Sequence, residues 1–234
     1  MAIELWRVPL PDGRLARAWF TDRADGDFAV TGPPSELEKR RRAVVDLPWV
    51  WLRQVHGSEV VEVGPATALD GVCGTRADAV ATTVEGVVAS VTVADCAPVA
   101  FVSPEGVVAA AHAGWRGLLS GVLGATVEVM RQRGATTIEA YLGPCIHPDC
   151  YEFGADDLAS LVSALGPAVR GRTAGGRPAL DLPTAVAAAL ARAEVRLAGA
   201  ADVCTACGGD ALFSHRARSD RRRHALAVWI ESQP

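Results

Sequence analysis

The chain has 234 residues, enough for one large domain with a full hydrophobic core. Its formal net charge of −4 argues against a nucleic-acid partner, although arginines gather locally between residues 216 and 223. Half of the residues are hydrophobic, yet no apolar run reaches the roughly 18 residues that a membrane span needs, so no membrane partner is expected.

Strand-type and helix-type patterns alternate along the chain. We expect strands at residues 4–9, 17–20, 49–54, 59–63, 79–83, 87–93, 99–102, 107–111, 138–142 and 225–230. We expect helices at residues 35–45, 117–133, 156–165 and 183–193, with Ser35 as a possible cap of the first and Asp181 or Thr184 near the start of the last. No repeat or linker divides the pattern, which predicts one α+β domain over residues 1–234.

Three turn-rich segments each place one metal-capable side chain at the end of an apolar run. They contain His56, Cys96 and His112. Three protein ligands leave one position of a zinc ion open, which is typical of a catalytic site and not of a structural one. The same cysteine and histidines could instead form a nucleophile and its base. Either interpretation predicts an enzyme.

The surroundings of these residues favour a cleft. Pro98 lacks an amide hydrogen, so the strand after Cys96 should turn out of a ladder. Gly114 and Gly117, which flank Trp115 and Arg116, indicate a close approach of the backbone. We expect the start of the following helix, near Gly117, to favour an anion.

The first residues contain no long apolar stretch and no small-residue cleavage site, so no signal peptide is expected and the predicted location is cytoplasmic. The six cysteines are then expected to be thiols or metal ligands. A competing structural zinc site could use four thiolates, from Cys145, Cys150, Cys204 and Cys207. A redox role for the C-x-x-C pair is less well supported, because no thioredoxin-like pattern surrounds it.

Several polar residues could support the site. Asp78 could be a surface turn residue, a carboxylate near the site, or a partner that orients a ligand histidine. Ser214 and Arg216 follow an apolar pair and could contact an anionic or polar group in a cleft. We interpret Arg218, Arg221 and Arg222 mostly as a solvated basic loop.

The order of these motifs resembles the polyphenol oxidase or laccase-domain family, also described as purine nucleoside phosphorylase of the laccase-domain type and as peptidoglycan editing factor. The matching segments begin with Gln-x-His-Gly and end with Phe-Ser-x-Arg, and they lie at residues 54–57, 77–82, 94–98, 110–117, 143–146, 151–154, 204–205 and 213–216. They occur in the right order between about residues 50 and 230, whereas the first 50 residues match poorly.

The resemblance implies a sandwich-like α+β fold with flanking helices and a zinc ion bound by His56, Cys96 and His112. It implies phosphorolysis of adenosine, inosine, guanosine and methylthioadenosine, with adenosine deamination as a side activity. We expect the residues that bind substrate and phosphate, or support the site, to be Arg116, Arg216, Gln54, Asp78, Ser214 and Arg223.

The sequence departs from the family near its C-terminus. His215 stands where the family usually has tyrosine, Ala217 replaces a second arginine, and Arg222 replaces the glycine before Arg223. These changes leave the predicted metal ligands intact, and the family's substrate preference is therefore not carried over to this chain.

The metal is predicted to be zinc. One thiolate and two imidazoles suit zinc. The five histidines are too few for a multicopper centre, so copper-dependent phenol oxidation is not favoured, although the site could hold a single copper ion.

Two other functions stay open. One is a hydrolase that removes a wrong amino acid from a cell-wall precursor, and the other is a metal-binding regulatory protein.

Overall fold

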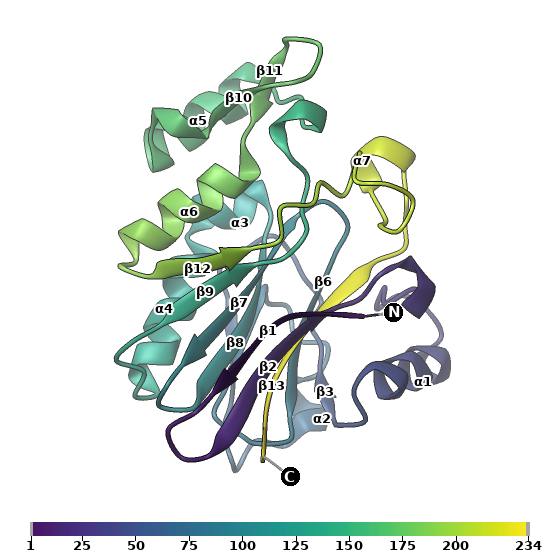
Figure 1. Ribbon diagram of the computed structural model, residues 1–234, viewed down its shortest axis with the longest axis vertical. Coiled ribbons are helices and arrows are strands. Elements are labelled where there is room, and N and C mark those ends of the chain that lie inside the picture. Colours follow the sequence, from purple (N-terminus) through teal and green to yellow (C-terminus); the bar gives the residue numbers. More distant parts are fainter. Residues whose placement is uncertain (1, 233–234) are drawn as a thin grey trace.

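The computed structural model describes residues 2–232, in which the strands form two large sheets and one small two-stranded sheet (Figure 1). One sheet has the strand order β1 (Ile3–Pro9), β2 (Arg14–Phe20), β13 (His224–Ser232), β6 (Val88–Val93) and β3 (Trp49–Val50). The other has the order β12 (Arg196–Ala200), β9 (Glu139–Leu142), β7 (Ala97–Ser103), β8 (Val107–Ala113), β5 (Ala79–Thr82) and β4 (Val60–Val63). The strands β10 (Arg170–Arg172) and β11 (Pro178–Leu180) form a small antiparallel hairpin.

Apolar side chains from both sheets fill the space between them. Phe20 and Leu226 contribute from the first sheet, and Val80, Val102 and Ala110 contribute from the second. Side chains alternate between the two faces of a strand, so the neighbouring residues of β7 and β8 point to the opposite face of the second sheet. The structure confirms the expected α+β class and its sandwich-like core.

Helices cover the outer faces of the sandwich (Figure 1). The outer face of the second sheet packs against α3 (Trp115–Ser120), α4 (Val122–Gln132) and α6 (Leu182–Arg192), and α5 (Ala155–Leu165) packs against α3 and α6. The first sheet packs against α1 (Pro34–Val44), and two short helices, α2 (Leu69–Val72) and α7 (His215–Arg218), lie in connecting segments. Within residues 2–232 no helix combines the length and apolar character needed to cross a membrane.

The helix predicted at residues 117–133 is two helices. Gly121 has φ +83°, a left-handed conformation that glycine adopts easily, and it ends α3 and precedes α4. The first helix begins at Trp115, two residues before the expected start, and has six residues. Anion binding at the start of this helix stays a prediction.

The other boundaries agree with the prediction to different degrees. Asp181 caps α6 as expected, because its carboxylate accepts a hydrogen bond from the N–H of Thr184 at 2.9 Å. Ser35 does not cap α1: the helix begins at Pro34 and has no side-chain cap. The strand expected at residues 49–54 is wrong after Val50, because the chain leaves the sheet there and forms the loop that leads to His56.

Candidate metal centre and its cleft

His56 lies in the loop between β3 and β4, and a buried carboxylate shapes that loop. Asp78 accepts hydrogen bonds from the backbone N–H groups of Val55 at 3.1 Å, His56 at 2.9 Å and Gly57 at 2.8 Å. His56 has φ +60°, which is uncommon for a residue with a side chain. The three hydrogen bonds hold the loop in this conformation and direct the imidazole of His56.

His112 is positioned by the same carboxylate. It lies near the end of β8, is buried, and its Nδ1 is 2.8 Å from Oδ1 of Asp78. A carboxylate that accepts from Nδ1 fixes the ring orientation and leaves Nε2 as the ligand atom. Asp78 is fully buried and therefore acts by positioning both histidine segments and not by direct contact with a substrate.

Cys96 follows a residue with a strained backbone. Asp95, between β6 and β7, has φ +89°. Its carboxylate accepts hydrogen bonds from the hydroxyl of Thr205 and from the backbone N–H of Arg216, both at 2.6 Å. Its carbonyl accepts from the N–H of Ile146 at 2.9 Å. These contacts from distant segments hold the strained turn that presents the thiol.

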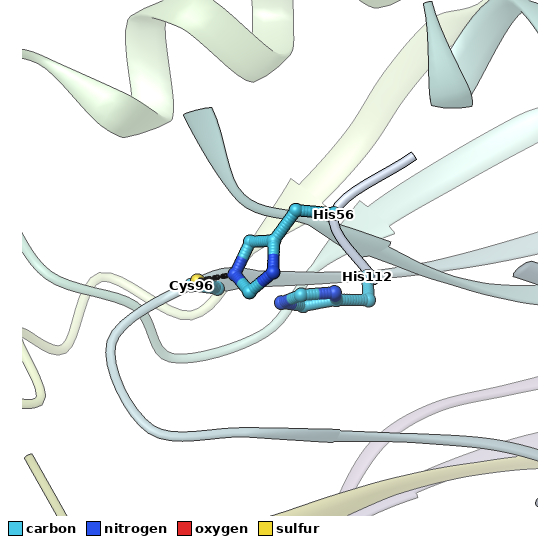
Figure 2. Close-up of side chains that lie close together, drawn as sticks. All are labelled: His56, Cys96 and His112. Carbon is cyan, nitrogen blue, oxygen red and sulfur yellow. Dashed lines mark hydrogen bonds between the residues drawn. The ribbon is translucent and has the colours of Figure 1, made fainter. Parts of the chain in front are cut away.

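The three predicted metal ligands converge (Figure 2). One ligand atom from each of His56, Cys96 and His112 lies within 4.8 Å of the others. Sγ of Cys96 is 3.9 Å from Nε2 of His56, and the two imidazole rings meet edge to face with centroids 4.7 Å apart. The donor set, two nitrogens and one sulfur, is one that zinc binds readily.

The charges of this group suit a cation. Burial raises the pKa of Cys96, but the positive charge of His112 and hydrogen bonds from both histidines lower it below its ordinary value. Burial lowers the pKa of His112, but the Cys96 thiolate and the Asp78 carboxylate raise it above its ordinary value. The sulfur is therefore held as a thiolate, the form that binds metal, and a bound cation would displace the proton from His112.

Gly114, two residues after His112, lies close to the two other ligands in space. A Cβ at Gly114 would lie 2.7 Å from Cδ2 of His56 and 3.1 Å from Sγ of Cys96. A methyl group at this position would therefore push the side chains of His56 and Cys96 away from their present places. The missing side chain thus makes room for the ligand group.

We expect Gly114→Ala to lower zinc affinity by about ten- to hundredfold, the range for changes in groups that support metal ligands. Gly124→Ala is the matched control, because Gly124 lies inside α4 and a methyl group added there would meet no other segment within 4 Å. It should raise the free energy of unfolding by about 0.5–1 kcal/mol and leave zinc affinity unchanged. Competition with a zinc chelator measures both variants, and equal affinities would contradict the role of Gly114.

A cleft of about 560 Å³ opens beside the ligand group. Three residues expected to bind substrate, Gln54, Arg116 and Arg223, line it. Gln54 supports the wall, because its amide is committed to Thr92: Nε2 donates to the carbonyl at 2.7 Å, and Oε1 accepts from the N–H at 2.7 Å. Arg116 is stacked 4.4 Å from the centroid of Trp115 and makes no ion pair with the part of the chain that the structure describes.

Two of the other expected residues lie outside the cleft lining. Ser214 is buried, and its hydroxyl accepts from the N–H of Ala217, so it caps α7. The guanidinium of Arg216 points elsewhere: it donates to the carbonyl of Glu152 at 2.7 Å and stacks over Tyr151.

Sequence reasoning missed other residues. Arg53, His215 and Arg221 line the cleft, and Arg221 is at the same time exposed, as expected for a solvated loop. Thr205 supports Asp95 as described above. The Cys204-Thr205 motif pointed to Thr205, but no signal in the sequence separates Arg221 from its neighbours.

Comparisons with known proteins agree with this architecture. The profile of a family described as multi-copper polyphenol oxidoreductase laccase matches residues 22–231. A purine nucleoside phosphorylase of Streptomyces coelicolor is 39% identical over 199 residues, which cover 84% of this chain and 81% of the relative. The purine nucleoside phosphorylase YfiH of Escherichia coli is 34% identical over 204 residues, which cover 84% and 82%.

A solved structure extends the likeness to the whole fold. The crystal structure of a Neisseria meningitidis protein matches with a TM-score of 0.83 at 27% identity, covering 98% of this chain and 99% of that one. The family profile spans nearly the whole chain, and the three residues of the ligand group lie within the matched range. The chain therefore belongs to the laccase-domain family described as multi-copper polyphenol oxidoreductase laccase.

Proposed function

We propose that this protein is a zinc-dependent purine nucleoside phosphorylase with adenosine deamination as a side activity. The observation that carries the proposal is the group of His56, Cys96 and His112 at a cleft that is also lined by arginines. Relatives named purine nucleoside phosphorylase, at 34% and 39% identity, support the same reaction. The cleft volume of about 560 Å³ falls in the range of small-molecule sites.

The donor set argues for zinc and against multicopper chemistry. Within residues 2–232, two groups of three potential ligands come together, and only His56 and His112 among the histidines take part in them. His215 lines the cleft, and His224 accepts a hydrogen bond from the N–H of Phe213 inside the core. A three-copper cluster needs more imidazoles than this arrangement offers.

Different residues around the cleft would serve different parts of the reaction. In phosphorolysis a phosphate oxygen bonds to C1′ of the ribose while the bond from C1′ to the purine nitrogen breaks, and the purine leaves with a proton. Arg116 would bind and orient the phosphate, and Arg53, Arg221 and Arg223 add positive charge around the same cleft. Held by His56, Cys96 and His112, the metal would supply a Lewis acid for an oxygen of the substrate or of water.

The direct test is incubation of purified protein with adenosine, with and without phosphate. We expect phosphorolysis to give ribose 1-phosphate and adenine only when phosphate is present. We expect deamination to give some inosine with or without phosphate. Mass spectrometry identifies all three products. Absence of both reactions, together with release of an amino acid from a cell-wall precursor, would replace the phosphorylase by the hydrolase.

Arg116→Ala should raise the KM for phosphate by about ten- to a hundredfold, because a charge-assisted contact with phosphate is worth about 1.5–3 kcal/mol. Adenosine deamination uses water and should change less. Arg216→Ala is the matched control: its guanidinium contacts Glu152, and the variant keeps the backbone N–H that binds Asp95. A larger effect on phosphate from Arg216→Ala than from Arg116→Ala would overturn this assignment.

A further inference from the structure

A second group of cysteines lies outside the cleft lining. One sulfur from each of Cys150, Cys204 and Cys207 lies within 4.8 Å of the others. Cys150 ends a short helical turn after β9, and Cys204 and Cys207 come from the segment that follows β12. Cys145, the fourth thiol considered from the sequence, is buried and does not belong to this group.

The backbone around Cys204 favours a thiolate. Its sulfur accepts a hydrogen bond from the N–H of His147 at 3.4 Å, and it accepts from the N–H groups of Ala206 and Cys207 as well. Three donors directed at one sulfur stabilise negative charge there. The last two donors lie two and three residues after Cys204, so the C-x-x-C turn itself supplies them.

The three sulfurs differ in exposure. Cys204 is buried, Cys150 is half-buried and Cys207 is exposed. A cation bound by the three sulfurs would therefore contact the buried Cys204 on one side, and it could enter from solvent on the side of Cys207. Three thiolates so close repel one another, and a cation among them balances their charge.

We propose that Cys150, Cys204 and Cys207 form a second metal site for a thiophilic cation, Zn²⁺ or Cu⁺. Binding forms three metal–sulfur bonds and releases to solvent the protons that the thiols carry, with no change in oxidation state. Soft sulfur ligands select these ions over Mg²⁺ or Ca²⁺. This site goes beyond the proposed function and does not depend on it.

The site would join the two segments that hold the strained turn before Cys96. Thr205, next to Cys204, donates to the carboxylate of Asp95, and Ile146 donates to its carbonyl. The two segments also meet directly, because the N–H of Thr205 donates to the carbonyl of Cys145 at 3.0 Å. A cation across them would make the turn at Asp95 more rigid, so its removal should weaken metal binding at the first site without removing a ligand there.

Metal content of the full-length protein tests the proposal. After incubation with excess zinc and gel filtration, we expect two zinc ions per wild-type chain, one in Cys96→Ser, one in Cys207→Ser and none in the double variant. Cys73→Ser should keep two, because Cys73 lies elsewhere and its thiol donates to the carbonyl of Trp49. An anaerobic Cu⁺ titration of the Cys96→Ser variant shows whether the same site takes copper.

The zinc content of the variants tests each of the two proposed sites separately. Equal zinc content in wild type and Cys96→Ser would contradict the first site, whereas equal content in wild type, Cys150→Ser and Cys207→Ser would overturn the second. Cobalt substitution adds a readout of the ligands: Cys207→Ser should remove thiolate-to-cobalt absorbance that Cys96→Ser keeps. A disulfide among the three cysteines would also overturn the proposal if the reduced thiols then bind neither Zn²⁺ nor Cu⁺.

Discussion

Cys96→Ser is expected to remove one equivalent of zinc and to lower adenosine phosphorolysis by more than about a hundredfold, beyond the loss that follows when only a supporting group is changed. Cys96 supplies the single sulfur of the ligand group, 3.9 Å from Nε2 of His56. Serine is close to cysteine in size, so the turn after Asp95 should keep its fold. The change removes the thiolate, which is the anionic ligand of the set.

Zinc content and turnover must be measured on the same preparation. Cys73→Ser is the control, since it removes a half-buried thiol that lies outside the cleft lining and outside both groups of potential metal ligands. Loss of turnover with full retention of zinc would favour the alternative in which Cys96 is a nucleophile and His112 its base. Retention of both zinc and turnover would reject a functional role for Cys96.

Asp78→Asn is expected to lower the free energy of unfolding by about 3–5 kcal/mol and zinc affinity by about ten- to hundredfold. One carboxylate oxygen accepts from the N–H of His56 and meets Nδ1 of His112, and the other accepts from Val55 and Gly57. An amide replaces one oxygen by an NH₂ group. Each oxygen contacts two of the four N–H groups. Whichever oxygen is replaced, two N–H donors then face the NH₂ donor of the amide inside the core.

The matched control is Asp181→Asn, because Asp181 also accepts a backbone N–H but caps a helix, where asparagine serves nearly as well. Urea unfolding of the zinc-free proteins separates the effect on stability from the effect on metal binding. Chelator competition then measures zinc affinity. If Asp78→Asn behaves like Asp181→Asn in both assays, the carboxylate does not organise the two histidine segments.

The ligand group could be located from the chain alone because its determinants are local. His56, Cys96 and His112 each follow an apolar run and have a glycine or proline within the next two residues, and the structure brings the three together. Gly114, in the segment that contains His112, indicated close backbone approach, and its neighbours in space are the other two ligands. The helices at residues 156–165 and 183–193 were predicted to within one residue at each end for the same reason: their periodicity is local.

The roles of the arginines and of the groups around the ligands could not be read in this way. Arg116 and Arg216 both follow motif residues, yet the first lines the cleft and the second reaches Glu152, 64 residues away in sequence. The hydroxyl of Thr205 donates a hydrogen bond to Asp95, which lies 110 residues away in sequence. Where a long side chain points, and which donor meets a buried carboxylate, depend on loops that pack together only when both sheets are assembled. Spacing along the chain carries no information about such contacts, because their geometry is set by the packing of distant segments.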